Sequence, residues 1–141
     1  MLSFHGDGEN RHRVEAPGGT SIGWVRGRTV GFRGLSSEHE AIDAAVDASR
    51  ALGAVLRRAF PGWPDHTPAA RSLRLVHDGA HEWISDGRVP IARLLRVRGD
   101  ASPERSYGLE FVLPSYASEG LALTAAQAIG GALLPRLAFE G

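Results

Sequence analysis

The most constraining feature of this sequence is the segment 73–97, in which two Asp-Gly pairs separate runs of strand-forming residues. The pairs are Asp78-Gly79 and Asp86-Gly87. Asp-Gly between such runs is a strong signal for a tight β-hairpin turn, because glycine readily adopts the positive φ that the turn requires. The segment therefore predicts three consecutive antiparallel strands, around which the rest of the fold must be built.

The first Asp-Gly turn also predicts which side chains share a face of the sheet. A two-residue turn at Asp78-Gly79 places His77 opposite Ala80 and sends His81 to the other face, beside Val76 and Trp83. The face of His77 is then shared by Leu73, Leu75, Glu82 and Ile84. Two histidines four residues apart converge on a metal ion when the segment is helical. In a hairpin they diverge, so no metal site is expected at His77, His81 and Glu82.

The third strand of this segment begins near Pro90, where a sheet edge or a bulge is expected because proline has no N–H to donate. Strict alternation beyond Pro90 places Arg93 on the core face, and it places Arg96 and Arg98 on the other face with Leu94. The apolar residues expected to be buried are Leu73, Leu75, Ile84, Ile91, Leu95 and Val97. Polar chemistry on that core face must then come from His77, Glu82 or Arg93.

Residues 20–32 predict a second hairpin. A three-residue turn at 26–28 places Trp24 opposite Val30 and Ile22 opposite Phe32, so that all four large apolar side chains can be buried together. A two-residue turn would instead set Trp24 against Thr29. Burial favours the first register. Its other face carries Gly23 opposite Gly31, which predicts a bare strip of backbone.

Two helices are predicted after β-rich blocks. Ser37 with Glu40 forms a capping box, and apolar residues then recur at helical spacing until Pro61-Gly62 ends the pattern. Thr124 with Gln127 forms a second capping box in a helix over 121–139. Residues 120–135 carry no charge, but this run is shorter than the roughly 20 residues needed to cross a bilayer. No membrane association is expected.

Together these elements predict an α+β fold in the order ββαββββα. It is a two-layer domain in which a long helix and a C-terminal helix pack on one face of an antiparallel sheet of about six strands. The domain is expected to span residues 18–141. Residues 1–17 are polar and lack periodicity, so they are predicted to form a flexible N-terminal arm.

The composition excludes some kinds of functional site and makes some partners unexpected. The chain of 141 residues has no cysteine, which excludes disulfides and thiolate nucleophiles and is compatible with the cytoplasm. All 16 basic residues are arginine, and 16 acidic residues balance them to a net charge of zero. A nucleic-acid partner is not expected, because the broad positive charge of such proteins is missing. No cofactor is expected, since no cofactor motif is present.

Two classes of function remain open. The favoured one is a non-catalytic protein-interaction or homo-oligomeric assembly module, either a homodimer or a complex with another protein. Its contacts would come from an exposed sheet face or from the small residues Ala126, Gly130 and Gly131 of the last helix. The alternative is a small-molecule-binding protein or modest enzyme with a pocket between the sheet and the long helix. Candidate ligand-binding residues are His77, Glu82, Arg93 and Trp83, and candidate anion-binding or partner-binding residues are Arg96 and Arg98.

Overall fold

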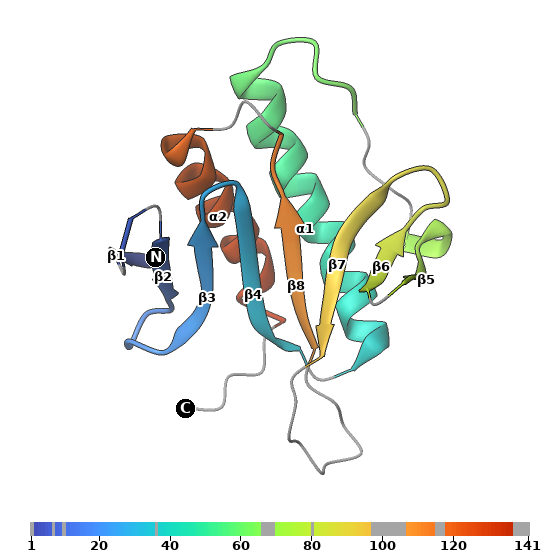
Figure 1. Ribbon diagram of the computed structural model, residues 1–141, viewed down its shortest axis with the longest axis horizontal. Coiled ribbons are helices and arrows are strands. Elements are labelled where there is room, and N and C mark those ends of the chain that lie inside the picture. Colours follow the sequence, from blue (N-terminus) through green and yellow to red (C-terminus); the bar gives the residue numbers. More distant parts are fainter. Residues whose placement is uncertain are drawn as a thin grey trace.

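In the computed structural model, eight strands form one antiparallel sheet and two helices lie against one of its faces (Figure 1). The structure describes residues 2–6, 8–9, 11–35, 37–65, 70–79, 81–96, 107–114 and 118–136. The first four strands are β1 (Ser3–Gly6), β2 (Arg11–Glu15), β3 (Ser21–Arg26) and β4 (Thr29–Leu35). The other four are β5 (Arg74–Asp78), β6 (His81–Ser85), β7 (Pro90–Arg96) and β8 (Tyr107–Val112). The helices are α1 (Glu38–Ala59) and α2 (Glu119–Leu133), and a short 3-10 helix, η1 (Ala70–Ser72), precedes β5.

The strand order is β1-β2-β3-β4-β8-β7-β6-β5, which divides the sheet into two halves. Each half is a four-stranded meander followed by a helix, and the halves meet where β4 pairs antiparallel with β8. Helices α1 and α2 pack against each other on the same side of the sheet (Figure 1). The α+β class and the placement of both helices are as predicted. The predicted count and order are wrong, because the sheet has eight strands rather than about six and the element order is ββββαββββα.

The two additional strands, β1 and β2, lie in residues 1–17, the segment assigned by its composition to an arm outside the domain. Three apolar residues of this segment, Leu2, Val14 and Ala16, are buried in the core. Both strands are only four or five residues long, and their open faces carry charged side chains such as Arg11 and Arg13. So few alternating apolar residues give no clear periodicity, although they suffice to anchor the segment once the neighbouring strand is present.

Helix α1 begins as its sequence predicts. The Ser37 hydroxyl accepts a hydrogen bond from the Glu40 backbone N–H at 3.1 Å, which satisfies one of the unpaired donors at the helix start. Glu38 and Glu40 lie in the first turn and Arg57 and Arg58 in the last, where each sign of charge complements the helix dipole. The buried face consists mostly of alanine and valine: Ala41, Ala44, Ala45, Val46, Ala48 and Val55. These small side chains allow α1 to lie close to the sheet.

Helix α2 begins earlier than predicted and ends at Leu133. Ser118 caps it by accepting from the Leu121 N–H at 3.2 Å. Thr124, the predicted cap, instead donates its hydroxyl to the Gly120 carbonyl within the helix at 2.9 Å. Within the described ranges, no helix has both the length and the apolar character needed to span a membrane.

The β3–β4 hairpin has a different register from either of those considered above. Arg26 pairs with Thr29 and Val25 with Val30 around a two-residue turn, in which Gly27 adopts a φ of 57°. Trp24 therefore lies opposite Gly31, on the face away from Val25 and Val30. Ile22 is buried all the same, because β3 bulges at this residue where it pairs with β2.

The β5–β6 hairpin is displaced by two residues from the predicted pairing, since His77 lies opposite Glu82. A shift of two residues preserves the alternation of side chains between faces. The predicted distribution of its side chains between the two faces of the sheet is therefore confirmed. His77 and Glu82 share the face of the buried Ile84, and Trp83 lies on the opposite face.

Strand β7 departs from the prediction because it bulges. Ser85 pairs with Pro90 and Ile84 with Ala92, which leaves Ile91 as an extra residue. A bulge near Pro90 is expected from the sequence, but it also inverts the alternation that follows. The two faces of β7 divide as follows: Ala92 and Leu94 are buried under the helices, whereas Arg93 and Leu95 lie on the uncovered face. Of the predicted core residues, Leu73 and Ile84 are buried, Leu75 and Ile91 are partly buried against the core, and Val97 lies outside the described residues.

Candidate functional site

The candidate site lies on the face of the sheet that neither helix covers (Figure 1). Trp24 projects onto this face directly opposite Gly31 of β4, and its indole lies across that glycine. A Cβ atom at position 31 would overlap the indole ring, so only glycine permits this placement. The predicted bare strip of Gly23 opposite Gly31 is therefore wrong. Gly23 pairs with Phe32 in the core, and Gly31 is covered by Trp24.

Four arginines lie on the same face as Trp24 in three neighbouring strands, and we call these five residues the Trp24 cluster. They are Arg11 and Arg13 of β2, Arg26 of β3 and Arg33 of β4. The guanidinium carbons of Arg26 and Arg33 lie 5.3 and 5.2 Å from the centroid of the indole, within the range of cation–π attraction. In the β2–β3 pairing, Arg11 is directly opposite Arg26 and Arg13 is directly opposite Trp24.

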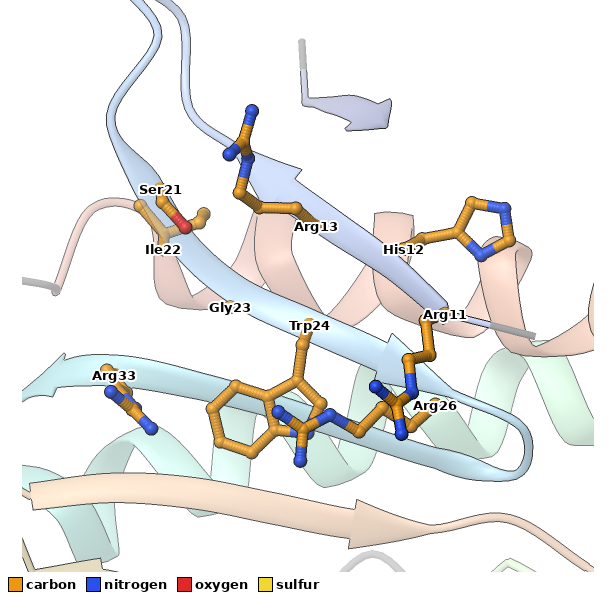
Figure 2. A pocket seen from close by; sticks show the side chains of 9 residues that line it. All are labelled: Arg11, His12, Arg13, Ser21, Ile22, Gly23, Trp24, Arg26 and Arg33. Atoms are coloured by element: carbon orange, nitrogen blue, oxygen red, sulfur yellow. The ribbon is translucent and has the colours of Figure 1, made fainter. Parts of the chain in front are cut away.

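The side chains of the cluster enclose an open hollow of about 420 Å³. Figure 2 shows Arg11 and Arg26 on one side of the indole and Arg33 on the other, whereas Arg13 points away toward the edge of the sheet. His12 also lines the hollow, but its imidazole points away from Trp24 and contacts Glu119 at the start of α2 at 3.3 Å. The floor of the hollow is thus an aromatic ring, and its rim is cationic.

Carboxylates flank the Trp24 cluster but neutralise only part of it. Glu15 accepts from Arg13 at 2.8 Å and also contacts His5 at 3.1 Å. Within the described part of the chain, Arg11, Arg26 and Arg33 have no carboxylate at ion-pair distance. Among the described residues, no carboxylate neutralises these three guanidinium groups at the hollow, which is the arrangement that proteins use to bind phosphate or carboxylate groups.

The structure divides the predicted ligand-binding residues between the two faces of the sheet. His77 and Glu82 are neighbours, with Nδ1 of His77 at 3.7 Å from Oε1 of Glu82, and they lie at the β5 edge on the helix-covered side. Trp83 and Arg93 are paired with each other on the uncovered side. Trp83 lies on the uncovered side by the simple alternation of β6, as predicted, whereas the bulge at Ile91 moves Arg93 there from the core face.

Arg93 forms an ion pair with Glu110 of β8, which is largely buried between the strands. This pair occupies the middle of the uncovered face, between Gly31 of β4 and Trp83 of β6. Arg93 is consequently a partner of Glu110 rather than a free cation. Arg98 lies outside the described residues, as does the side chain of Arg96, so their predicted role in anion binding stays a prediction.

A second hollow, of about 300 Å³, lies between α1 and the adjoining ends of β7 and β8. It has the expected position between helix and sheet, but its lining differs from the predicted one. Apolar residues dominate the lining: Leu52, Leu56, Trp63, Pro64, Val89, Ile91 and Val112. The Ser49 hydroxyl at this hollow has no hydrogen-bond partner among the described residues.

The residues of the Trp24 cluster are not among those predicted, although two signals were present in the sequence. Arginines alternate with other residues at positions 11 and 13, and Arg26 follows Trp24 at the same spacing, as expected for one face of a strand. The first signal lay in a segment assigned to an arm. The second was hidden because the predicted register placed Trp24 in the core.

The described residues contain no group of three or more histidine, aspartate or glutamate side chains arranged to hold a metal ion. Comparison with known proteins finds no matching family model, no similar curated protein and no similar solved structure.

Proposed function

We propose that this protein is a non-catalytic interaction module that binds an acidic segment of another protein on the uncovered face of its sheet. The observation that carries the proposal is the Trp24 cluster, in which Arg11, Arg26 and Arg33 surround an indole without a described carboxylate partner. Tryptophan and arginine are the residue types most enriched among the side chains that dominate binding energy at protein interfaces.

The distribution of charge supports an acidic partner. The net charge of the chain is zero, but many of its carboxylates lie on the helical layer, for example Glu38 and Asp43 of α1. On the uncovered face, both glutamates described on β2 and β8, Glu15 and Glu110, are already paired with arginine. Complementary charge of this kind steers a partner to the correct face and speeds association.

The extent of the face supports a macromolecular partner. Eight strands at about 4.8 Å spacing give a surface roughly 34 Å wide. Trp83 and Leu95 continue the apolar surface beyond the Trp24 cluster. A second copy docked about a two-fold axis through the cluster would oppose the same arginines, so we assign the face to a different protein.

The test is binding of a labelled acidic peptide of Glu, Leu and Ser, followed by fluorescence anisotropy at low salt. The double substitution Arg26→Gln with Arg33→Gln should weaken binding by at least about tenfold, since two charge-assisted hydrogen-bonding groups are lost. The matched control is Arg28→Gln with Arg71→Gln, which removes two exposed arginines outside the hollow, one in the β3–β4 turn and one in η1, and should leave the affinity within about twofold. Equal binding by both double variants, or no binding by the wild type, would overturn the proposal.

Sedimentation velocity of the protein alone tests whether a second copy covers the face instead. A dimer that disappears in the Arg26→Gln with Arg33→Gln variant would assign the Trp24 cluster to self-assembly.

The second hollow supports one alternative function, the binding of a small apolar ligand between α1 and β7. Its volume of about 300 Å³ is at the lower end for ligand sites, and its lining is apolar around the single Ser49 hydroxyl. A medium-chain alcohol or fatty acid should then raise the melting temperature by mass action. The bulky substitution Val89→Trp at the lining should reduce that shift, and an unchanged melting temperature in the wild type would exclude this function.

A further inference from the structure

We infer that the Trp24 cluster recognises a phosphorylated side chain in its partner, and not merely an acidic one. The inference rests on the proposed function and adds the chemical group that the site binds, a phosphate. It is carried by the number, the origin and the orientation of the arginines that surround the hollow.

Three arginines of the cluster are available to a ligand. Arg13 is neutralised by Glu15, which leaves Arg11, Arg26 and Arg33 for a ligand. A carboxylate carries one negative charge on two oxygens, whereas a phosphorylated serine carries a charge of about −1.5 to −2 on three terminal oxygens at pH 7. Three guanidinium groups therefore match the charge and the acceptor count of a phosphate monoester better than those of a glutamate.

The three available arginines reach the hollow from different directions. The three arginines come from three different strands, β2, β3 and β4. Arg11 and Arg26 approach from one side of the indole and Arg33 from the other (Figure 2). A planar carboxylate accepts a fork of N–H groups mainly in its own plane, but the oxygens of a phosphate point in tetrahedral directions and accept from several sides.

Trp24 holds two of the arginines in place before a ligand binds. The guanidinium groups of Arg26 and Arg33 are held 5.3 and 5.2 Å from the centroid of the indole. Arginine that stacks on an aromatic ring keeps its N–H edges free for a ligand and loses less conformational entropy when it binds. Because Gly31 fixes the position of the indole, the sheet sets the spacing of the two groups before the ligand arrives.

Two arginines of the cluster also repel each other in the absence of a ligand. Arg11 and Arg26 are directly opposite each other on neighbouring strands, and like charges in such pairs destabilise a sheet. No described carboxylate relieves this repulsion. A bound phosphate would relieve it, so the removal of this repulsion would add to the free energy of binding.

A phosphorylated side chain suits the cluster better than a nucleic-acid backbone does. The cluster spans only three strands, about 10 Å. Beyond it, Glu110 of the neighbouring strand β8 and Glu15 further along β2 are each paired with an arginine. The cluster is therefore one compact positive patch and not the extended positive groove that follows a nucleic-acid backbone.

The experiment measures thermal stabilisation by blocked phosphoserine, a single residue with no sequence context, and compares it with blocked glutamate. Phosphoserine should raise the melting temperature at concentrations at least about tenfold lower than glutamate, as expected for one additional charge-assisted contact. In the Arg11→Gln and Arg33→Gln variants this preference should disappear. The Arg28→Gln control should retain it, because Arg28 lies in the β3–β4 turn and does not line the hollow.

The outcomes separate this inference from the proposed function. If an acidic peptide binds through Arg26 and Arg33 but phosphoserine and glutamate stabilise the protein equally, the proposed function stands and the phosphate preference is wrong. If neither compound stabilises the protein and no acidic peptide binds, both are wrong. If oligo-dT displaces the peptide at lower concentration than a phosphoserine peptide does, the surface is a nucleic-acid site and the inference is overturned.

Discussion

Gly31 shows how one residue without a side chain sets the position of the largest side chain on the open face. Because a Cβ at this position would overlap the Trp24 indole, Gly31→Ala must displace the ring or the strand. We expect a loss of about 1–3 kcal/mol in the free energy of unfolding, as is usual for overpacking, measured by urea denaturation. Binding of an acidic peptide should weaken as well, because Arg26 and Arg33 lose their common platform.

A double-mutant cycle identifies the cause of that loss. In a Trp24→Leu background the same Gly31→Ala substitution should cost much less, since the atoms it overlaps are gone. An equal cost in both backgrounds would show that the glycine matters for the backbone and not for the indole.

Asp86 gives a prediction about pH. Its carboxylate accepts hydrogen bonds from the backbone N–H of Arg88 at 2.9 Å and of Val89 at 3.2 Å, and these bonds lower the pKa of Asp86 below its ordinary value. A lowered pKa means that the folded state favours the charged form. The stabilisation is therefore complete above the pKa of the unfolded chain, about 3.9, and is lost as the pH falls through the folded value.

Asp86→Ala should accordingly reduce the free energy of unfolding at pH 7, and the difference from the wild type should shrink as the pH falls below about 4. Urea denaturation at a series of pH values measures both effects. A difference that stays constant across this range would show that the loop between β6 and β7 does not depend on the charge.

At the scale of the element, the two adjacent glycines of α2 have different surroundings. A Cβ at Gly130 would overlap the Leu2 side chain and approach Phe32 to 3.1 Å, whereas nothing lies within 4 Å of a Cβ at Gly131. Gly130→Ala should therefore destabilise the protein by about 1–3 kcal/mol through overpacking. Gly131→Ala should stabilise it by about 0.5–1 kcal/mol, because alanine loses less backbone entropy in a helix.

Thermal unfolding of the two single variants tests this contrast directly, since the positions are neighbours in one helix. Effects of the same sign would contradict the assignment of Gly130 to the helix–sheet contact. The contact also bears on the predicted dimerisation through Ala126, Gly130 and Gly131, because Ala126 and Gly130 are buried within the chain and only Gly131 is exposed to a second copy.

The elements also show which sequence patterns are reliable. Helix α1 could be predicted from its Ser37 cap to its last turn, because capping and helical spacing are local properties of consecutive residues. The faces of the β5–β6 hairpin could be predicted even though its pairing shifted, because a shift of two residues preserves the alternation. The faces of β7 could not, because one extra residue at Ile91 exchanges every side chain that follows.

At the scale of the whole molecule, the described residues of the segment 1–17 form part of the sheet. They supply β1 and β2, and Leu2 and Val14 from this segment have 6% and 0% of their surface exposed. A chain of residues 18–141 loses these two side chains from the core, at about 1.5–3 kcal/mol each, and exposes the edge of β3. We expect this truncated chain to be far less stable than the full chain, as measured by circular dichroism during urea denaturation. Equal stability of the two chains would show that the segment adds nothing to the free energy of unfolding, as expected of a flexible arm.

The sequence by itself determined the α+β class, the two helices and the strand-forming character of residues 73–97, because these depend on local spacing, capping and turn residues. Only the tertiary structure decided where the charges gather. Arg11, Arg26 and Arg33 look like ordinary charges in a neutral sequence, and only the pairing of β2, β3 and β4 places them around one indole. The register of a sheet depends on bulges and on the burial of a whole face. The candidate site depends on that register, and so it could not be predicted from the order of the residues.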